Sequence, residues 1–294
     1  MRNTVSQNAS PVGAARSFLF VPASRPERFA KALDSGADVI VFDLEDAVGP
    51  DHKATARDQL ADRLPGFGRA QLARTLVRIN AADSPWHAQD LRLLATWIPQ
   101  GLAGAMVPKA DDPSALRAIG IALGPGAQLV PLIESLAGLD AVNLIARTPQ
   151  VARLAFGHLD FQLDLGMRCS AEEAELASVR FALVAASRRA TLPPPVDGVT
   201  TDTGNAQRLA ADARRSLALG FGGKLCIHPA QVQGVNDAFT PSAEEVDWAR
   251  RVVAGAQTHR GAAFSMDGRM VDLPVIALAQ RTLTKAPAQD VVMR

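Results

Sequence analysis

Short apolar segments alternate with helical segments along most of the chain, and this alternation constrains the fold more than any other feature. The apolar segments are residues 17–23, 38–44, 75–80, 104–110, 127–135, 151–157, 195–201 and 223–229. Segments between them, such as 25–36, 52–64 and 204–220, carry apolar residues at helical spacing. Strands that are apolar at nearly every position need cover on both faces. About eight such strand–helix units over roughly 250 residues are typical of a closed parallel barrel, so we predict an α/β fold, a (β/α)8 TIM barrel, over residues 16–240.

An open, doubly wound sheet is the alternative fold for this pattern. That fold binds phosphates or dinucleotides through a glycine-rich loop that follows a strand and opens a helix. The glycine-rich segment GFGGK, residues 220–224, leads into an apolar strand segment instead. The sequence therefore favours the closed barrel.

The two ends of the chain do not follow the alternation. Residues 1–15 are polar and small and contain no apolar signal core, so we expect a disordered leader. In the tail, a helix is expected from about Ser242, a hairpin around Asp267 and Gly268, and a last helix from about Val275. This tail, residues 241–294, exceeds what an eight-unit barrel needs. We interpret it as a helix–hairpin lid, an arm that joins subunits, or both.

Composition excludes several classes of protein. The formal net charge is +1, so no overall electrostatic field points to a nucleic acid partner. No apolar run approaches the roughly 20 residues that span a bilayer, so we expect no membrane association. The two cysteines, Cys169 and Cys226, show neither metal-ligand spacing nor a disulfide framework, which fits a reducing cytoplasm. We therefore expect a cytoplasmic globular protein.

Polar and charged residues stand where many of the apolar segments end. They are Asp43, Glu45, Asp46, Arg78, Asn80, Lys109, Glu134, Ser135, Asp160 and His228. The active sites of such barrels lie at the carboxyl ends of the strands, so the fold would bring these residues to one rim. Any single one could instead cap a helix. Such residues at several strand ends together favour a functional site.

The residue types at this rim indicate metal and carboxylate chemistry. Glu134 and Asp160 follow neighbouring strands, and two hard oxygen ligands with room for water and substrate suit Mg2+. Arg78 could bind a substrate carboxylate through its planar fork. His158 and His228 are possible bases, although a histidine near a strand end is more often structural.

Seven segments, in this order, resemble one known family. They are RSFLFVPASRPERFAKAL, VIVFDLEDAV, TLVRIN, PLIES, FGHLDFQLDLG, IHPAQV and FTPSAEEV. From about Arg16 onward the chain is similar to the citrate lyase beta-subunit-like family, within the HpcH/HpaI aldolase superfamily. The resemblance implies a (β/α)8 barrel that cleaves a 3-hydroxyacyl thioester with a second carboxylate, of the citryl-, malyl- or citramalyl-CoA type. The products would be an acyl-CoA and a 2-oxo acid.

The resemblance also implies roles for residues that bind the metal and the substrate. Glu134 and Asp160 would be the Mg2+ ligands, and Arg78 would hold the carboxylate of the oxo acid. Three basic residues lie where the family binds the nucleotide end of CoA, and they are Arg16, Arg25 and Lys31. A carboxylate would act as the general base.

The remaining implied roles concern the rim carboxylates and the tail. Asp272 matches an aspartate that relatives deliver from the tail of a neighbouring subunit, which implies a homo-oligomer, a trimer or a hexamer. Glu45 and Asp46 would support catalysis through Arg78, through Lys53 or through water on the metal. Arg78, Asp272, Glu45 and Asp46 are therefore the catalytic candidates.

Other readings of the same residues stay open. Lys109 could be a Schiff-base lysine, although this chemistry does not need one. The chain could be the beta subunit of a citrate lyase complex that acts on an acyl-carrier-protein thioester, or an oxo-acid aldolase that uses no CoA. His158, in GHLD, departs from the family pattern and could narrow or re-charge the substrate pocket.

Overall fold

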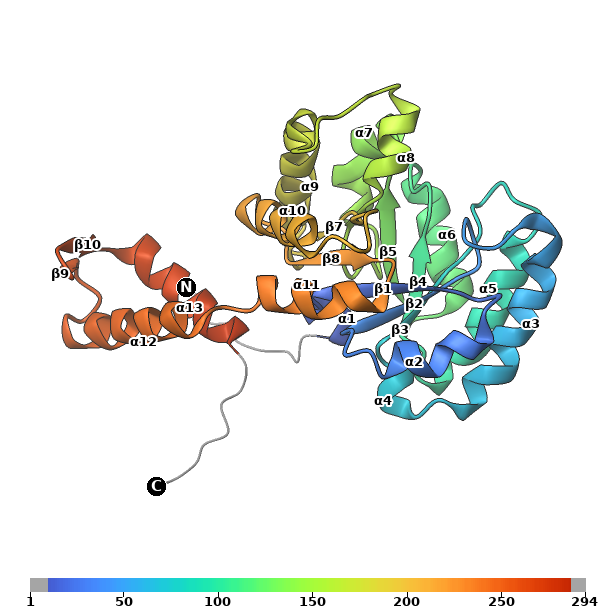
Figure 1. Ribbon diagram of the computed structural model, residues 1–294, viewed down its shortest axis with the longest axis horizontal. Helices are drawn as coiled ribbons and strands as arrows, with labels where there is room; N and C mark the ends of the chain where they lie inside the picture. Colours follow the sequence, from blue (N-terminus) through green and yellow to red (C-terminus); the bar gives the residue numbers. More distant parts are fainter. Residues whose placement is uncertain (1–9, 287–294) are drawn as a thin grey trace. The chain divides into compact units, whose positions relative to one another are not determined.

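Eight parallel strands close into a barrel in the computed structural model, which describes residues 10–286 (Figure 1). The strands are β1 Ser17–Pro22, β2 Val39–Asp43, β3 Thr75–Arg78, β4 Gly104–Val107, β5 Gln128–Ile133, β6 Ala155–Phe156, β7 Val196–Asp197 and β8 Gly223–Cys226. They pair in chain order, and the pairing of β1 with β8 closes the barrel, with Leu19 opposite Cys226. The predicted (β/α)8 fold is therefore confirmed.

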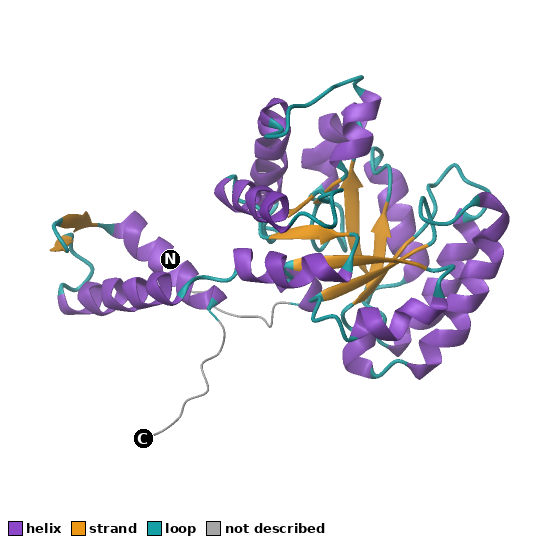
Figure 2. Cartoon of the chain, viewed as in Figure 1, coloured by secondary structure: helices purple, strands orange, loops and turns teal. Residues whose placement is uncertain are grey.

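Helices surround these strands, as Figure 2 shows. The helices of four or more residues are α1 Pro11–Ala14, α2 Phe29–Leu33, α3 Lys53–Arg63, α4 Arg69–Leu72, α5 His87–Trp97, α6 Pro113–Leu123, α7 Leu136–Ile145, α8 His158–Asp164, α9 Ala177–Arg189, α10 Ala206–Ala218 and α11 Val232–Phe239. Because each strand is covered outside by helices and inside by its opposite strands, every residue of β2 is buried. This double cover explains the continuous apolar runs in the sequence.

The barrel interior is filled by side chains from alternate strand positions. Phe18, Val39, Leu76 and Met106 belong to one buried cluster. Gly104, with φ of 157°, allows a close approach of β4 to β5, because a Cβ there would lie 1.8 Å from the backbone oxygen of Gln128 on β5. A packed interior of this kind leaves the strand ends as the place for a site.

The amino-terminal segment corrects one expectation. Residues 10–15 of the expected disordered leader are ordered, because α1 begins at Pro11 and buries Val12 completely. Val12 and Ala15 join the barrel core, and the buried guanidinium of Arg153 donates to the backbone oxygens of both residues. Residues 1–9 of that leader lie outside the described residues.

The chain divides into two compact units, residues 1–236 and residues 237–294. The second unit contains α12 Ala243–Thr258, the hairpin of β9 Phe264–Met266 and β10 Arg269–Val271, and α13 Leu273–Lys285. Ser242 and Glu245 form a capping box that begins α12. Val252, Val271 and Ile276 contribute to this unit's own apolar cluster. Among residues 10–286, no helix has the length and apolarity needed to cross a membrane.

Candidate active site

Charged side chains meet at the carboxyl ends of neighbouring strands in the barrel unit. A cavity of about 400 Å³ opens there. Its polar lining consists of Asp43, Asp46, Arg78, Glu134, His158 and Asp160. Its apolar lining includes Phe20, Leu132, Phe156, Val199, Leu225 and Ile227. The structure therefore brings together the residues that the sequence placed at the ends of β2, β3, β5 and β6.

Arg78 is the centre of an ion-pair cluster. Its Nε lies 2.7 Å from Oδ1 of Asp43, and its Nη2 lies 2.6 Å from Oδ2 of the same residue. Its Nη1 lies 2.9 Å from Oε2 of Glu45, as an ion pair without hydrogen-bond alignment, and 3.4 Å from Oδ2 of Asp46. The guanidinium fork that the sequence assigned to a substrate is thus already used by Asp43. What remains for a ligand is the Nη1 side, where Asp46 is 63% exposed and can be displaced.

Asp43 is the site residue whose role the sequence reasoning missed. It stands directly opposite Arg78 in the register of β2 and β3. Besides the guanidinium, its oxygens accept the backbone N–H groups of Glu45 and Ala47, at 2.8 and 3.1 Å. The signal for this role is the strand register, which becomes readable only once β2 and β3 are known to be neighbours.

Lys53 stabilises the turn that carries Glu45 and Asp46. Its buried Nζ donates to the backbone oxygens of Leu44 and Glu45, both at 2.8 Å, and lies 5.4 Å from the ring centroid of Trp86. Lys53 therefore positions Glu45 through the backbone rather than through its carboxylate.

The rim carries more negative charge than its partners neutralise. Burial raises the pKa of Glu45 to about 8, although Arg78 opposes the shift. Burial also raises the pKa of Glu134 to about 7, while a hydrogen bond from the Lys109 backbone opposes the shift and the Asp160 charge adds to it. The pKa of Asp160 is raised as well, first by burial and then by Asp46. Crowded carboxylates of this kind are stabilised by a bound cation.

Glu134 and Asp160 have the chemistry of a magnesium pair. Oε1 of Glu134 accepts the backbone N–H of Lys109 at 2.6 Å. Its other oxygen faces Gly157, where an added Cβ would come within 2.4 Å of it, so glycine keeps that oxygen accessible. Among residues 10–286, no group of three or more His, Cys, Asp or Glu side chains is placed to hold a metal. A two-carboxylate site fits Mg2+, which usually keeps several water or substrate ligands.

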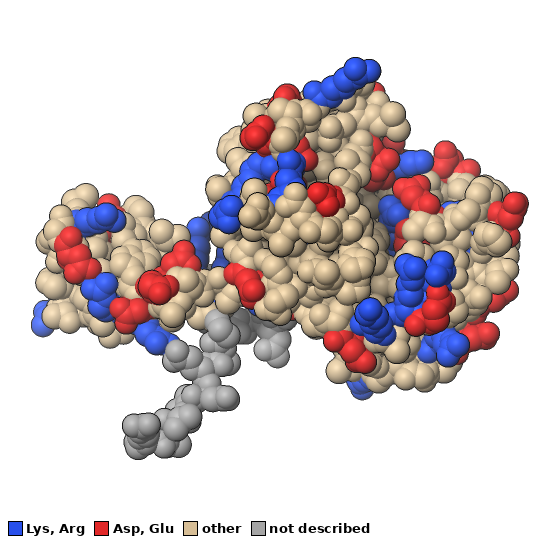
Figure 3. Space-filling view, in the orientation of Figure 1, with Lys and Arg blue, Asp and Glu red and all other residues tan. Residues whose placement is uncertain are grey.

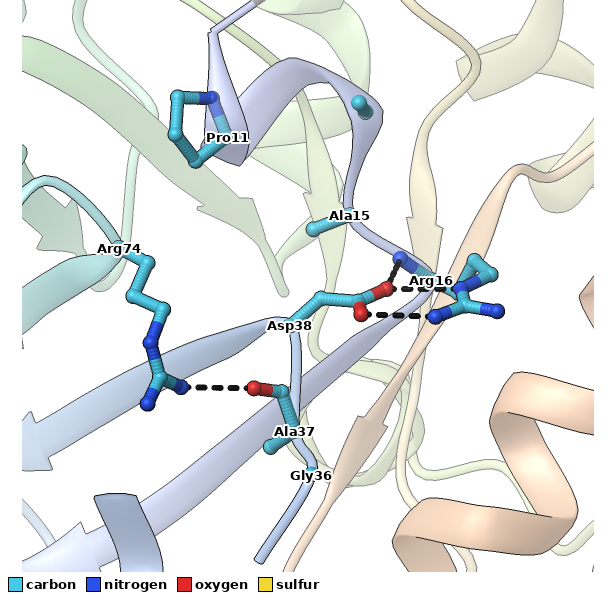
Figure 4. A pocket seen from close by; sticks show the side chains of 8 residues that line it. Pro11, Ala15, Arg16, Gly36, Ala37, Asp38 and Arg74 are labelled. Carbon is cyan, nitrogen blue, oxygen red and sulfur yellow. Dashed lines mark hydrogen bonds and ion pairs between the residues drawn. The ribbon is translucent and has the colours of Figure 1, made fainter. Parts of the chain in front are cut away.

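The basic residues expected to bind CoA separate into two places. Arg25 lies at the carboxyl end of β1, where its backbone N–H donates to the oxygen of Pro22 and its side chain pairs with Glu27 at 2.6 Å, and Lys31 lies further along, in α2. Arg16 precedes β1 and lies at the opposite end, where its guanidinium is held by Asp38 (Figure 4). A strand six residues long lies between Arg16 and Arg25. The structure therefore does not group Arg16 with the rim residues.

Three other candidates have local structural partners. His228 accepts the backbone N–H of Ala230 through Nδ1 at 3.2 Å and caps the turn after β8. Asp272 lies in the second unit, where it caps α13 and accepts the backbone N–H of Val275 at 3.4 Å. Lys109 contributes its backbone N–H to Glu134 from a left-handed conformation with φ of 47°.

Comparisons with known proteins agree with this geometry. The model of the HpcH/HpaI aldolase/citrate lyase family matches residues 16–229, and the chain belongs to that family of enzymes, which includes lyases. An L-malyl-CoA/beta-methylmalyl-CoA lyase of Cereibacter sphaeroides is 34% identical over 95% of this chain and 97% of its own. A (3S)-malyl-CoA thioesterase of the same species is 33% identical over 93% of this chain and 95% of its own.

A solved structure is similar over nearly the whole chain. It is the protein CitE from Mycobacterium tuberculosis in complex with magnesium, acetoacetate and coenzyme A. The two chains superpose with a TM-score of 0.80 at 34% identity, covering 93% of this chain and 98% of the other.

Proposed function

We propose that this protein is a Mg2+-dependent carbon–carbon lyase that acts on the CoA thioester of a 3-hydroxy acid with a further carboxylate. It would release an acyl-CoA and a 2-oxo acid. The observation that carries the proposal is the meeting of Arg78, Glu134 and Asp160 around one cavity at the strand ends. The similarity to a malyl-CoA lyase and to a magnesium- and CoA-bound CitE supports it.

In this proposal Glu134 and Asp160 hold the metal, and a bound Mg2+ would stabilise negative charge on substrate oxygens. The Nη1 side of Arg78 orients the carboxylate of the oxo acid once Asp46 has moved aside. Asp43 and Glu45 fix the guanidinium, so its remaining donors are aimed before the substrate arrives. Preorganised donors of this kind lower the barrier because they need no rearrangement during the reaction.

Carboxylates of the chain then act as proton acceptor and donor. Asp46 on the rim, or Asp272 supplied by a neighbouring subunit, takes the proton of the substrate hydroxyl. The electron pair left on that oxygen forms the carbonyl of the 2-oxo acid as the bond to the thioester α-carbon breaks. The electron pair of the broken bond passes to the α-carbon as an enolate, which takes the proton back from the protonated carboxylate. Phe20, Phe156 and Leu225 form apolar walls that keep water from the carbanionic carbon.

Arg25 and Lys31 remain proposed contacts of the nucleotide end of CoA, since both follow β1 in the chain and carry positive charge. On the face shown in Figure 3, acidic and basic side chains are intermixed over the barrel unit, with no field of one sign. Binding of the CoA phosphates would therefore rest on individual cations rather than on overall charge.

A product analysis tests the proposed function. Purified protein with Mg2+ is incubated separately with citryl-, malyl-, citramalyl- and methylmalyl-CoA, with the corresponding acyl-carrier-protein thioesters and with the free hydroxy acids, and the products are separated by chromatography. We expect an acyl-CoA and a 2-oxo acid in equal amounts from at least one thioester. Free CoA with an intact hydroxy acid would show a thioesterase instead. Cleavage of the acyl-carrier-protein thioester alone would favour a complex subunit, and cleavage of free hydroxy acids would favour a CoA-independent aldolase.

A further inference from the structure

The carboxylate of Glu134 is held between two backbone segments. On one side, its Oε1 accepts the backbone N–H of Lys109 at 2.6 Å. On the other side it packs on Gly157, where an added Cβ would lie 2.4 Å from Oε2 and 2.6 Å from the Cβ of Glu134. Glu134 is 5% exposed. Gly157 contributes space rather than a donor, so the hydrogen bond from Lys109 is the contact that orients the carboxylate.

Lys109 donates this hydrogen bond from an unusual backbone conformation. Its φ is 47°, which lies in the left-handed region that residues other than glycine seldom occupy. Such a conformation persists where the surrounding structure determines it, and it is found most often at functional sites. At Lys109 it coincides with a hydrogen bond to a proposed metal ligand.

The residues on both sides of Lys109 are fixed by the barrel. Pro108 is buried, and its ring fixes its own φ. The backbone N–H of Ala110 donates to the oxygen of Leu132 on β5 at 3.2 Å. The oxygen of Ala110 lies against α7, because an added Cβ at Gly138 would come within 2.8 Å of it. With both neighbours fixed, the φ of Lys109 decides the direction in which its N–H points.

The backbone of Lys109, rather than its side chain, makes the contact with Glu134. The side chain is exposed, whereas the N–H donates to Oε1. The contact should therefore survive a substitution that keeps the N–H and the left-handed conformation. It should weaken when either of these is removed.

We propose that Lys109 is a positioning residue for the metal ion of this site. Its left-handed backbone aims the N–H at Oε1, and this hydrogen bond fixes the orientation in which the carboxylate of Glu134 meets Mg2+. The inference rests on the proposed function, which assigns Mg2+ to Glu134 and Asp160. Groups that orient a metal ligand in this way typically contribute a factor of roughly 10–100 to metal affinity.

Two substitutions at one position test the role of the backbone conformation. Glycine adopts a positive φ readily and valine strongly disfavours it, while Lys109→Gly and Lys109→Val remove the same charge. Isothermal titration with MgCl2 gives Kd for Mg2+ without turnover. We expect Lys109→Gly to bind Mg2+ no more weakly than the natural protein, and Lys109→Val to bind it at least tenfold more weakly than Lys109→Gly. Arg260, with φ of 49° in the second unit, is the matched control, and its glycine and valine variants should share one Kd.

An amide-to-ester replacement at Lys109 tests the hydrogen bond itself. The α-hydroxy analogue of lysine keeps the side chain and replaces the N–H with an oxygen. We expect at least tenfold weaker Mg2+ binding in an ester protein whose circular dichroism is unchanged. An ester protein that binds Mg2+ as tightly as the natural protein, or equal affinity in Lys109→Gly and Lys109→Val, would overturn the inference and leave the metal assignment standing. Natural protein that binds no Mg2+, or undiminished binding in Asp160→Asn, would instead overturn the metal assignment on which the proposed function rests.

Discussion

Arg78 shows how a single residue organises the rim. Its three nitrogens face three carboxylates, and 12% of its side chain remains exposed. Asp43 is almost fully buried, so the loss of Arg78 would leave an unpaired charge in the interior. Breaking a buried pair in this way typically costs about 3–5 kcal/mol. The same contacts that stabilise the fold therefore aim the guanidinium at the cavity.

The substitution Arg78→Lys tests this dual role. A lysine has one ammonium group and cannot reproduce the two parallel bonds to Asp43 while still reaching a ligand. We expect Kd for pyruvate with Mg2+ to rise at least tenfold and Kd for CoA to stay within twofold. Titration calorimetry measures both constants. Equal weakening of the two ligands would mean that Arg78 is structural alone.

Asp38 allows a test of electrostatics away from the site. Partial burial raises its pKa, but hydrogen bonds from Arg16 and Ser17 outweigh that effect and keep the pKa below the usual value. Its contribution to stability is therefore present at neutral pH and is lost as the pH falls through its folded pKa.

Comparison with Asp38→Asn should show this loss. Because Arg16 is partly exposed, we expect the substitution to lower the free energy of unfolding by roughly 0.5–1 kcal/mol at pH 7. The difference between the two proteins should shrink below about pH 4. Urea unfolding at pH 7 and pH 3 measures it. A difference that grows with acid would contradict the depressed pKa.

The hairpin of β9 and β10 shows an element that local sequence determines. Asp267 and Gly268 have φ of 52° and 75°, the left-handed values that the Asp-Gly pair adopts readily. The pairing of Phe264 with Val271 then follows from the two-residue turn.

Gly268→Ala should loosen this hairpin. A Cβ at a left-handed residue costs about 1–2 kcal/mol. Amide hydrogens across residues 264–271 should then exchange about fivefold or more faster in a mass-spectrometric experiment. Gly66→Ala is the control, because an added Cβ at Gly66 meets no atom within 4 Å and its φ is not in the left-handed region. Unchanged amide exchange in Gly268→Ala would show that the left-handed conformation at Gly268 does not determine the stability of the hairpin.

Sequence reasoning succeeded where the signal is local or periodic. The alternation of strands and helices, the Asp-Gly turn and the start of a helix near Ser242 were all readable. It failed where distant residues meet. The pairing of Asp43 with Arg78 depends on the register of β2 and β3, and the position of Arg16 depends on which end of β1 it occupies. The helix α1 is ordered because Val12 packs into the barrel core, most of whose other residues come from strands far along the chain.

At the scale of the whole molecule, the chain consists of a barrel unit and a second helical unit with its own apolar core. Glu134 belongs to the first unit and Asp272 to the second. We propose that the second unit acts as a lid or as a subunit arm and that Asp272 completes a site in a neighbouring subunit. Its capping bond to Val275 explains its place in α13 but leaves one carboxylate oxygen for that role.

Mixing two inactive variants tests a shared site. Asp272→Asn should keep α13 intact, because asparagine caps helices as well as aspartate does. When Asp272→Asn and Glu134→Gln proteins exchange subunits, some oligomers regain a site with Glu134 from one chain and Asp272 from the other. We expect partial recovery of thioester cleavage in the mixture. No recovery, despite exchange demonstrated by mass spectrometry, would place Asp272 in its own subunit's site or outside any site.

The most direct test of the central claim is a Mg2+ titration of thioester cleavage. Protein freed of metal with EDTA is mixed with malyl- or citramalyl-CoA, and the release of 2-oxo acid is followed as Mg2+ is added. We predict a saturable rise of at least a hundredfold for the natural protein and no rise for the double variant Glu134→Gln with Asp160→Asn, whose circular dichroism should be unchanged. Full activity of the metal-free protein, or an equal response of the double variant, would contradict the account.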